Sequence, residues 1–398
     1  MSLLVKAESD HSSPATGVSD KRTDVGYGRS RLWLGITAVG TLVVFCVMGL
    51  WLDLPLRWIG SIDTNSATQA LMIAGFVLAY VLVQLPFDVL GGFVLPRRFG
   101  RSHLPLARYL PLLLRGVAIH ATILWMMAMA FTVAGAYAGV VGVVAAGLIG
   151  VLLLLWLRTV VARLLATLSP AGSAEVDAAN PLRAVYVNCA DEGFTGNITG
   201  VFRPRAQVLP TEWRERLDAD AFATVLRRRA VAVSSGSWLR GRLLAISFTL
   251  AGLALACWLV GPERLGQASG TIELSLWFSL WSFAGLLVLP TLSRRAAADI
   301  DWRVVEAGAS RDSIDRMSRQ LDALQDGEPF RPGVVETIFY TIPSAGRRVG
   351  QIGPSWLPGF WDVARTSVYL SIAGCGLLGR AVHCNCGRPA LWAFLPTD

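Results

Sequence analysis

The feature that most constrains this chain is a series of six apolar runs, each long enough to cross a lipid bilayer. The runs are Leu32 to Leu52, Thr68 to Leu95, Gly116 to Tyr137, Gly139 to Leu157, Leu243 to Val260 and Ile272 to Leu289. A hydrocarbon layer about 30 Å thick requires roughly 20 helical residues. Hydrophobic residues make up 53% of the sequence and charged residues 16%. The sequence therefore predicts a mainly α-helical, polytopic membrane protein with about six transmembrane helices.

The distribution of basic residues predicts how these spans are oriented. The net charge of +8 comes mostly from arginines that flank the spans, so it indicates topology rather than nucleic-acid binding. Alternate loops are poor in basic residues, holding only Arg57 and Arg264. This asymmetry places both termini in the cytoplasm. The strong use of Arg, Ala, Gly and Val suggests a GC-rich bacterial genome, and we expect the protein in the bacterial inner membrane.

The polar regions predict a domain that is split by a transmembrane hairpin. We expect a disordered tail over residues 1–30 and four spans within residues 31–157. The hairpin occupies residues 243–290. It separates one cytoplasmic half, residues 158–242, from a second half with the C-terminal tail, residues 291–398. Because a hairpin of two transmembrane helices starts and ends on the same side of the membrane, the two halves can form one domain.

Local patterns predict the elements of that domain. Ala184 to Val187 is typical of a short strand, and Gly200 to Phe202 is expected to begin another. Ser293 to Gly308 and Asp312 to Leu324 are expected to be helices, and the second has an apolar face at helical spacing. The last apolar run, Ser367 to Leu378, is too short to span a membrane. We expect it to be buried or interfacial.

The most informative polar stretch is Leu209 to Arg242, which precedes the fifth span. Asp218 is a candidate N-cap for a helix. Arg228 and Ala232 lie on one face of that helix, one turn apart. An apolar stripe on a different face predicts the side on which the helix packs. The residues of the stripe are Phe222, Leu226, Ala230 and Val233.

Residues Val225 to Val233, VLRRRAVAV, resemble a known active-site helix. They are similar to the V-L-A-H-E-L-G-H-V helix of the CAAX prenyl protease and HtpX group of integral-membrane zinc metallopeptidases. In that family the two histidines of H-E-x-x-H bind zinc and the glutamate is the general base. The matching positions here hold Arg228, Arg229 and Ala232. The resemblance therefore implies a zinc-metallopeptidase-type α+β domain whose central helix cannot hold Zn²⁺.

A second segment continues the resemblance after the sixth span. Ser293 to Asp301, SRRAAADID, is similar to the family pattern S-R-R-x-E-x-x-A-D, whose glutamate is the third zinc ligand. Ala297 occupies the position of that ligand, and Asp301 matches the final aspartate. The resemblance thus implies that the scaffold is retained while the third ligand is lost.

Two further segments resemble the family more loosely. Thr341 to Arg348, TIPSAGRR, is similar to a histidine-proline segment followed by arginine, with Ile342 at the histidine position and Arg347 as the retained arginine. Thr195 to Gly200 resembles the edge strand that precedes the active-site helix. In order and placement these segments surround the fifth and sixth spans.

No other group of residues predicts a catalytic zinc site, which needs about three protein ligands and an open position for water. His120 lies inside the third span, where it more often bonds a neighbouring helix than serves a function. The tail segment His383 to Cys386, HCNC, offers soft ligands without a distant partner pair, so a structural or incidental role is favoured. Arginine beside the site would also repel the ion. We expect no metal and no other cofactor.

Three other polar groups allow two interpretations each. Gln84 and Asp88, late in the second span, form either a polar pocket or an interfacial helix end. Asp191 and Glu192 could serve acid–base chemistry, although a solvated loop is favoured. The triplet Arg227 to Arg229 either binds phosphate, anionic lipid or an acidic partner, or it faces solvent or pairs with the aspartates after the sixth span.

Together these observations predict a catalytically inactive membrane metallopeptidase homologue, a pseudopeptidase. It would bind or regulate a polypeptide partner at the lipid bilayer, with the peptide pairing to the edge strand by β-augmentation, which requires no metal. Two alternatives stay open: an active zinc-dependent endopeptidase with an unconventional metal site, and a membrane anchor or sensor whose basic patch binds anionic lipid. A transporter is disfavoured, because apart from His120 and Asp88 the spans are nearly free of ionisable residues.

Overall fold

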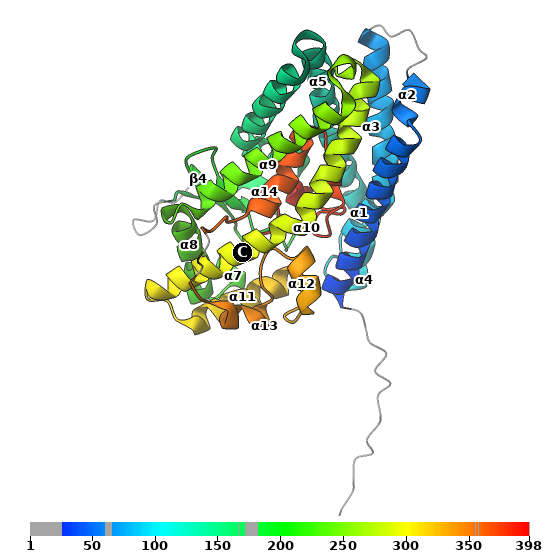
Figure 1. The fold of residues 1–398 in the computed structure, drawn as a ribbon. Helices are drawn as coiled ribbons and strands as arrows, with labels where there is room; N and C mark the ends of the chain where they lie inside the picture. The colour runs from blue at the N-terminus through cyan, green and yellow to red at the C-terminus, as the bar shows by residue number, and fades with distance from the viewer. Residues whose placement is uncertain are drawn as a thin grey trace, which may run out of the picture.

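The computed structural model describes residues 26–59, 66–166, 168–171, 182–354, 356 and 358–397. Long helices form a bundle, and shorter helices and a small sheet form a layer at one end of it (Figure 1). Helix α1 (Tyr27–Trp51) begins inside the stretch that we expected to be disordered, so that expectation is wrong for residues 27–30. Residues 1–25 of the same stretch lie outside the described residues.

Within the described part of the chain, five helices are long and apolar enough to cross a membrane. They are α1, the helix running from Ser66 to Arg98, α5 (Leu106–Trp156), α9 (Ser237–Val260) and α10 (Ala268–Glu306). The protein is therefore mainly helical, with several membrane-spanning helices, as predicted. The stretch from Ser293 to Gly308, which we expected to be a separate helix, instead extends the last span as part of α10, which contains Pro290.

The longest helix, α5, folds back on itself. Its backbone is non-helical at Ala138 and Gly139, and Gly139 has a φ of 53°, which glycine adopts readily. At 1.5 Å per residue, an unbroken helix of 51 residues would be about 77 Å long, far more than the ~30 Å of hydrocarbon. The break between the third and fourth apolar runs, after Tyr137, is thus a tight turn. Two close contacts show that the arms run antiparallel: Gly142 with Ala134, and Gly150 with Met127.

The second spanning helix is irregular at its end. Helix α3 (Ser66–Val89) contains Pro86 and continues through a π-helical turn, η1 (Leu90–Val94), into α4 (Leu95–Arg98). Gly91 and Gly92 in this turn lie directly against the C-terminal segment. A Cβ atom on Gly92 would lie 1.9 Å from the carbonyl oxygen of Gly387. The glycines therefore permit backbone contact that any side chain would block.

The C-terminal segment lies inside the bundle. Its helix α14 (Val363–Leu370) packs between α9 and α10, and Figure 1 shows the orange and red segment passing among the long helices. No residue from Trp361 to Thr397 is exposed. The prediction that the last apolar run is buried is confirmed. The segment continues through η4 (Ser371–Gly374), η5 (Leu378–Arg380) and α15 (Pro389–Ala393).

Polar residues of the spans hold this segment in place. Asp88 forms a buried ion pair with Arg380 and also accepts a hydrogen bond from the Gly387 N–H at 2.8 Å. The His120 ring lies 5.7 Å from the ring of Trp392, centre to centre. The side chain of Asp88 is fully buried, which agrees with the interpretation as a polar pocket. These intramembrane groups are contacts for the chain's own C-terminus.

The sheet has four strands in the order β1-β2-β4-β3. Strands β2 and β4 are parallel, and the two outer pairs are antiparallel. The strand predicted from Ala184 is confirmed. Gly200 to Phe202, expected to begin a strand, instead lie in the loop after β3, where Gly200 has a φ of 124°. The strands are β1 (Ser169–Pro170), β2 (Ala184–Asn188), β3 (Asn197–Thr199) and β4 (Ala206–Pro210).

Helices that precede and follow the α9–α10 hairpin in the sequence pack together over this sheet. Helix α11 (Arg311–Gln325) packs on α8 (Ala219–Ser234) through Ile314, Met317 and Leu321, so its predicted apolar face is confirmed. The remaining short elements are α2 (Leu54–Ile59), α6 (Arg158–Leu165), α7 (Trp213–Arg216), η2 (Pro262–Arg264), α12 (Gly333–Phe339), α13 (Ala345–Arg348) and η3 (Val349–Gln351).

Candidate functional site

Helix α8 carries the positions that resemble the metallopeptidase motif. The Asp218 carboxylate accepts a hydrogen bond from the Ala221 N–H at 2.7 Å, which confirms the predicted N-cap. The fully buried face of α8 contains Val225, Arg228, Arg229 and Ala232. Phe222, Leu226 and Val233 of the predicted apolar stripe pack against the apolar clusters of the domain but are only half-buried, so the stripe lies at the edge of the packing face. Arginines can occupy the buried face because each has polar partners there.

Two arginines converge on Asp301 of α10. The Arg228 Nε lies 2.6 Å from Oδ1, and the Arg348 Nε lies 2.7 Å from Oδ2. A second nitrogen of Arg348 lies 3.3 Å from Oδ1. All three side chains are at most 2% exposed. Both carboxylate oxygens therefore accept charge-assisted hydrogen bonds, and the triad links α8, α10 and α13.

Arg229 connects the helix to the sheet. Its Nη1 donates to the Val208 carbonyl at 3.0 Å, and its Nη2 donates to the Thr195 carbonyl at 2.7 Å. The guanidinium carbon also lies 5.5 Å from the ring centre of Trp213. The resemblance assigns this position to a general base. A guanidinium that stays protonated and donates to two carbonyls cannot accept a proton from water.

Alanines occupy the two other positions that the resemblance assigns to metal ligands. Ala232 follows Arg228 by one turn on α8, and Ala297 precedes Asp301 by one turn on α10. Both are buried, and α8 packs against α10. Their methyl groups have no lone pair to give to a metal. In the part of the chain that the structure describes, no three His, Cys, Asp or Glu side chains gather as a metal site would require.

The structure selects Arg348 rather than Arg347 as the arginine at Asp301. Arg347 is exposed, whereas Arg348 is buried. Neighbouring residues in a helix point about 100° apart, so only one of them can face Asp301. Ile342, at the position matched to histidine, is half-buried. Sequence reasoning missed Arg348 because a loose resemblance does not fix which of two adjacent arginines is aligned.

The arginine triplet does not form a basic patch. Arg227 faces solvent, but Arg228 and Arg229 are buried and bonded. The interpretation in which the triplet pairs with the aspartates therefore holds for Arg228 and Asp301, while Asp299 pairs with Arg303 at 3.0 Å. One exposed arginine gives little attraction to an anionic membrane.

Strand β3, which we expected to accept a peptide, is closed. All three of its residues are buried. The Ile198 N–H donates to the Asn197 side chain at 2.6 Å, and the Ile198 carbonyl accepts from Arg242 at 3.4 Å. β-augmentation requires free backbone groups on the edge of a sheet. In this conformation an added strand would have to displace contacts made by the chain itself.

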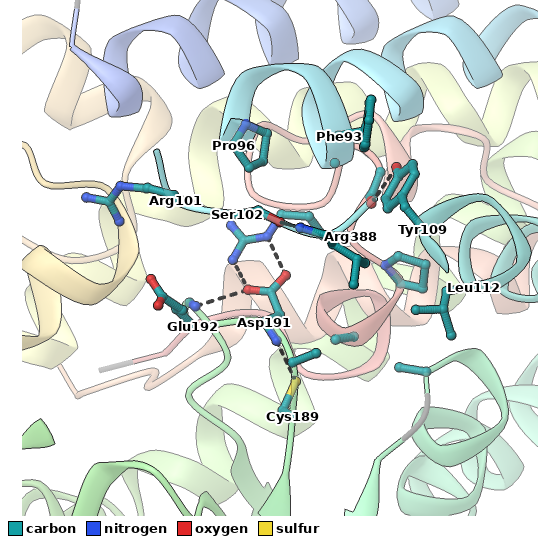
Figure 2. Close-up of a pocket in the computed structure, with 18 of the residues that line it drawn as sticks. Phe93, Pro96, Arg101, Ser102, Tyr109, Leu112, Cys189, Asp191, Glu192 and Arg388 are labelled. Carbon is teal, nitrogen blue, oxygen red and sulfur yellow. Dashed lines mark hydrogen bonds and ion pairs between the residues drawn. The ribbon is translucent and has the colours of Figure 1, made fainter. Parts of the chain in front are cut away.

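A second candidate is an open pocket of about 160 Å³, shown in Figure 2, near the start of α5. Asp191 accepts a hydrogen bond from Arg388 there at 2.6 Å. Burial raises the pKa of Asp191, but Arg388 outweighs this effect and holds the pKa below its usual value. Burial raises the pKa of the nearby Cys189 thiol to about 12, so the thiol is not a nucleophile at neutral pH. Glu192 pairs instead with Arg216 at 2.9 Å. This arrangement does not provide a general acid or base.

The HCNC segment packs within the C-terminal structure. Its His383 ring lies 5.1 Å from the Tyr340 ring, and burial lowers the pKa of His383 to about 3. The Cys386 thiol donates to the Ala381 carbonyl at 3.2 Å, and the Cys384 thiol contacts Asn385. These contacts support a structural role for the segment.

Comparisons with known proteins identify the fold. No family model matches the sequence, and no curated protein matches it. The structure is similar to the crystal structure of S. mikatae Ste24p, with a TM-score of 0.57 and 14% sequence identity. The match covers 74% of this chain and 77% of that chain. It supports, at the level of the fold, the resemblance to membrane metallopeptidases that the central helix first suggested.

Proposed function

We propose that this protein is a catalytically inactive homologue of membrane metallopeptidases, acting as a binding or regulatory protein for a polypeptide partner. The proposal includes six membrane crossings, with α5 contributing two, and both termini on the cytoplasmic side of a bacterial inner membrane. The observation that carries it is the triad of Arg228, Asp301 and Arg348, which occupies the place that the resemblance assigns to the metal centre. The likeness in fold to Ste24p supports the same scaffold.

The electrostatics of the triad oppose a metal ion. The two guanidiniums keep their charge at ordinary pH. At an effective dielectric constant of about 20, a divalent cation ~5 Å from one guanidinium is repelled by roughly 7 kcal/mol. Asp301, the one carboxylate in the triad, already accepts hydrogen bonds on both oxygens. A zinc ion would have to break these bonds and would still lack ligands at Ala232 and Ala297.

The triad also explains how the scaffold remains folded without metal. A structural or catalytic ion would connect the helices that carry its ligands. Here the ion pairs make that connection between α8 and α10, and Arg348 adds α13. The domain therefore keeps its shape, which leaves binding as the activity that this geometry supports.

Metal analysis and a peptidase assay on the purified full-length protein test the proposal. We expect far less than one zinc per chain after purification in zinc-containing buffer, and no chelator-sensitive cleavage of casein or short peptides. An established zinc peptidase assayed in the same detergent controls for the conditions. About one zinc per chain together with cleavage that a chelator stops would refute the proposal.

A further inference from the structure

Residues 358–362, sequence PGFWD, lie beside β3 and the first turns of α9. The Gly359 carbonyl accepts a hydrogen bond from Arg240 Nε at 3.1 Å. The Trp361 N–H donates to the Ser237 hydroxyl at 3.1 Å and contacts its carbonyl at 3.3 Å. The backbone of the segment is thus bonded to the first turn of α9 at Gly359 and at Trp361.

The side chains of this segment face the edge strand and the degenerate centre. The Asp362 carboxylate accepts a hydrogen bond from the Asn197 amide of β3 at 2.8 Å. Trp361 is 4% exposed and shares one buried apolar cluster with Ile198 of β3 and Ala232 of α8. The indole therefore packs in the same buried cluster as the edge strand and the position that the resemblance assigns to the second zinc-binding histidine.

Glycines on both sides allow the close contact. A Cβ atom on Gly241 of α9 would lie 2.1 Å from the carbonyl oxygen of Trp361. A Cβ atom on Gly359 would lie 2.6 Å from the Ser237 hydroxyl oxygen. The cleft accepts this segment because neither surface carries a side chain at these two points.

Asp362, which bonds the segment to β3, lacks a hydrogen-bond partner for one of its carboxylate oxygens in the part of the chain that the structure describes. Asp362 has a φ of 60°, which is unfavourable for a residue with a side chain. Among the described residues, no group bonds its buried Oδ1. The neighbouring Arg158, 1% exposed, likewise has no partner for Nη1 or Nη2 in the described structure. Buried groups without partners reduce stability, so this contact is easier to release than a fully bonded one.

We propose that the cleft between β3 and α9 is a binding site for an extended polypeptide segment, and that residues 358–362 occupy it as an intramolecular ligand. The inference rests on the proposed function, since a protein that acts by binding needs a site for its partner. A partner segment would carry an aromatic residue followed by an acidic one, as Trp361 and Asp362 do. It would enter when the intramolecular segment leaves and frees the Asn197 amide and the Ser237 hydroxyl, which now bond the segment.

A disulfide lock tests whether the segment has to leave. The Cβ position at Gly359 lies 3.4 Å from the Ser237 Cβ, close to the spacing across a disulfide, so Ser237→Cys with Gly359→Cys can be cross-linked by oxidation. The probe is a fluorescent peptide of residues 358–366, PGFWDVART. We expect at least tenfold weaker binding to the oxidised protein than to the same protein reduced. The single variant Ser237→Cys controls for oxidation of native cysteines.

Two variants open the cleft by different means. Trp361→Ala removes the indole, and Gly241→Ala adds a methyl group that collides with the segment. Both should speed hydrogen exchange of the Ile198 amide by at least tenfold. Trp361→Ala should also bind the peptide at least tenfold more tightly than wild type, whereas Gly241→Ala should not, because its methyl group collides equally with the Trp361 carbonyl of the peptide. The matched control is Gly40→Ala, because a Cβ atom at Gly40 meets open space.

The outcomes distinguish this inference from the proposed function. Equal peptide binding and equal Ile198 exchange in the oxidised and reduced lock would overturn the inference, even if the opening variants fail to fold. Faster exchange in Trp361→Ala without peptide binding would also overturn it. Either result would leave a metal-free, inactive protein untouched. Conversely, zinc-dependent cleavage would refute the proposed function without changing the exchange measurement.

Discussion

The adjacent arginines of α13 allow a sharp test of the triad. Arg348→Ala leaves Oδ2 of Asp301 without its partner in a site that is 0% exposed, while Arg228 still neutralises the carboxylate. Breaking a buried ion pair typically destabilises a protein by about 3–5 kcal/mol. Because one guanidinium remains, we expect a loss of about 3 kcal/mol in the free energy of unfolding. Arg347→Ala removes the same side chain from an exposed position and should change stability by less than about 0.5 kcal/mol.

Thermal unfolding of the two variants in the same detergent, followed by circular dichroism at the helix band, measures the difference. For a chain of 398 residues, a loss of about 3 kcal/mol corresponds to a fall in Tm of roughly 3–5 °C. If Arg347→Ala lowers Tm as much as Arg348→Ala does, then Asp301 is not held in the way the structure shows. The retained arginine would then be Arg347, as the sequence alignment first suggested.

Three further changes test the charges of the fold. Replacing the whole triad by apolar residues of similar size, Arg228→Met, Asp301→Leu and Arg348→Met, should leave Tm within about 1 °C of wild type, because no buried charge is left unpaired. A fall as large as that of a single variant would contradict this. Burial raises the pKa of Asp322 from 3.8 to about 6, so the folded state binds this proton more tightly than the unfolded state does. The free energy of unfolding should therefore fall by roughly 3 kcal/mol as the pH rises from about 4 to about 6. Asp322→Asn should flatten this pH dependence, measured by urea or heat denaturation. Asp88→Asn should free the C-terminal segment for proteolysis at concentrations that spare wild type, and an unchanged digestion pattern would count against its role as an anchor.

The spans could be predicted because a bilayer imposes length and hydrophobicity on each of them separately. Even the turn at Gly139 is visible in the sequence, as a break between two apolar runs. For the C-terminal segment, the sequence could predict that the segment is buried or interfacial but not which residues it contacts. Its partners are glycines and a carboxylate several hundred residues away, such as Gly92 and Asp88. Contacts at that separation leave no periodic pattern in either segment.

The candidate site was predictable in its residues and less so in its contacts. The pairing of Arg228 with Asp301 was one of several interpretations of the triplet, because sequence shows the charges but not which helix face is buried. The amphipathic pattern of α8 placed the arginines on the polar face, which is the usual outcome. The structure buries them because Asp301 and the carbonyls of Val208 and Thr195 supply partners. Where buried polar partners are present, ion pairs and hydrogen bonds between helices decide which face is buried, and the local hydrophobic pattern does not.

Under the proposed function, the arginine at position 228 is better understood as compensation for a lost metal ion than as simple loss of a ligand. Asp301 is buried, and a scaffold that had only lost its metal would leave this carboxylate with Arg348 alone. Arg228→His, the change that restores one histidine of the motif, should therefore lower stability by about 2–3 kcal/mol and bind no zinc, since Ala232 and Ala297 still offer no ligand. Thermal unfolding with metal analysis of the same sample checks both points. A variant as stable as wild type would show that Arg228 contributes nothing to the triad, and zinc bound by it would show that the centre is closer to a metal site than its ion pairs indicate.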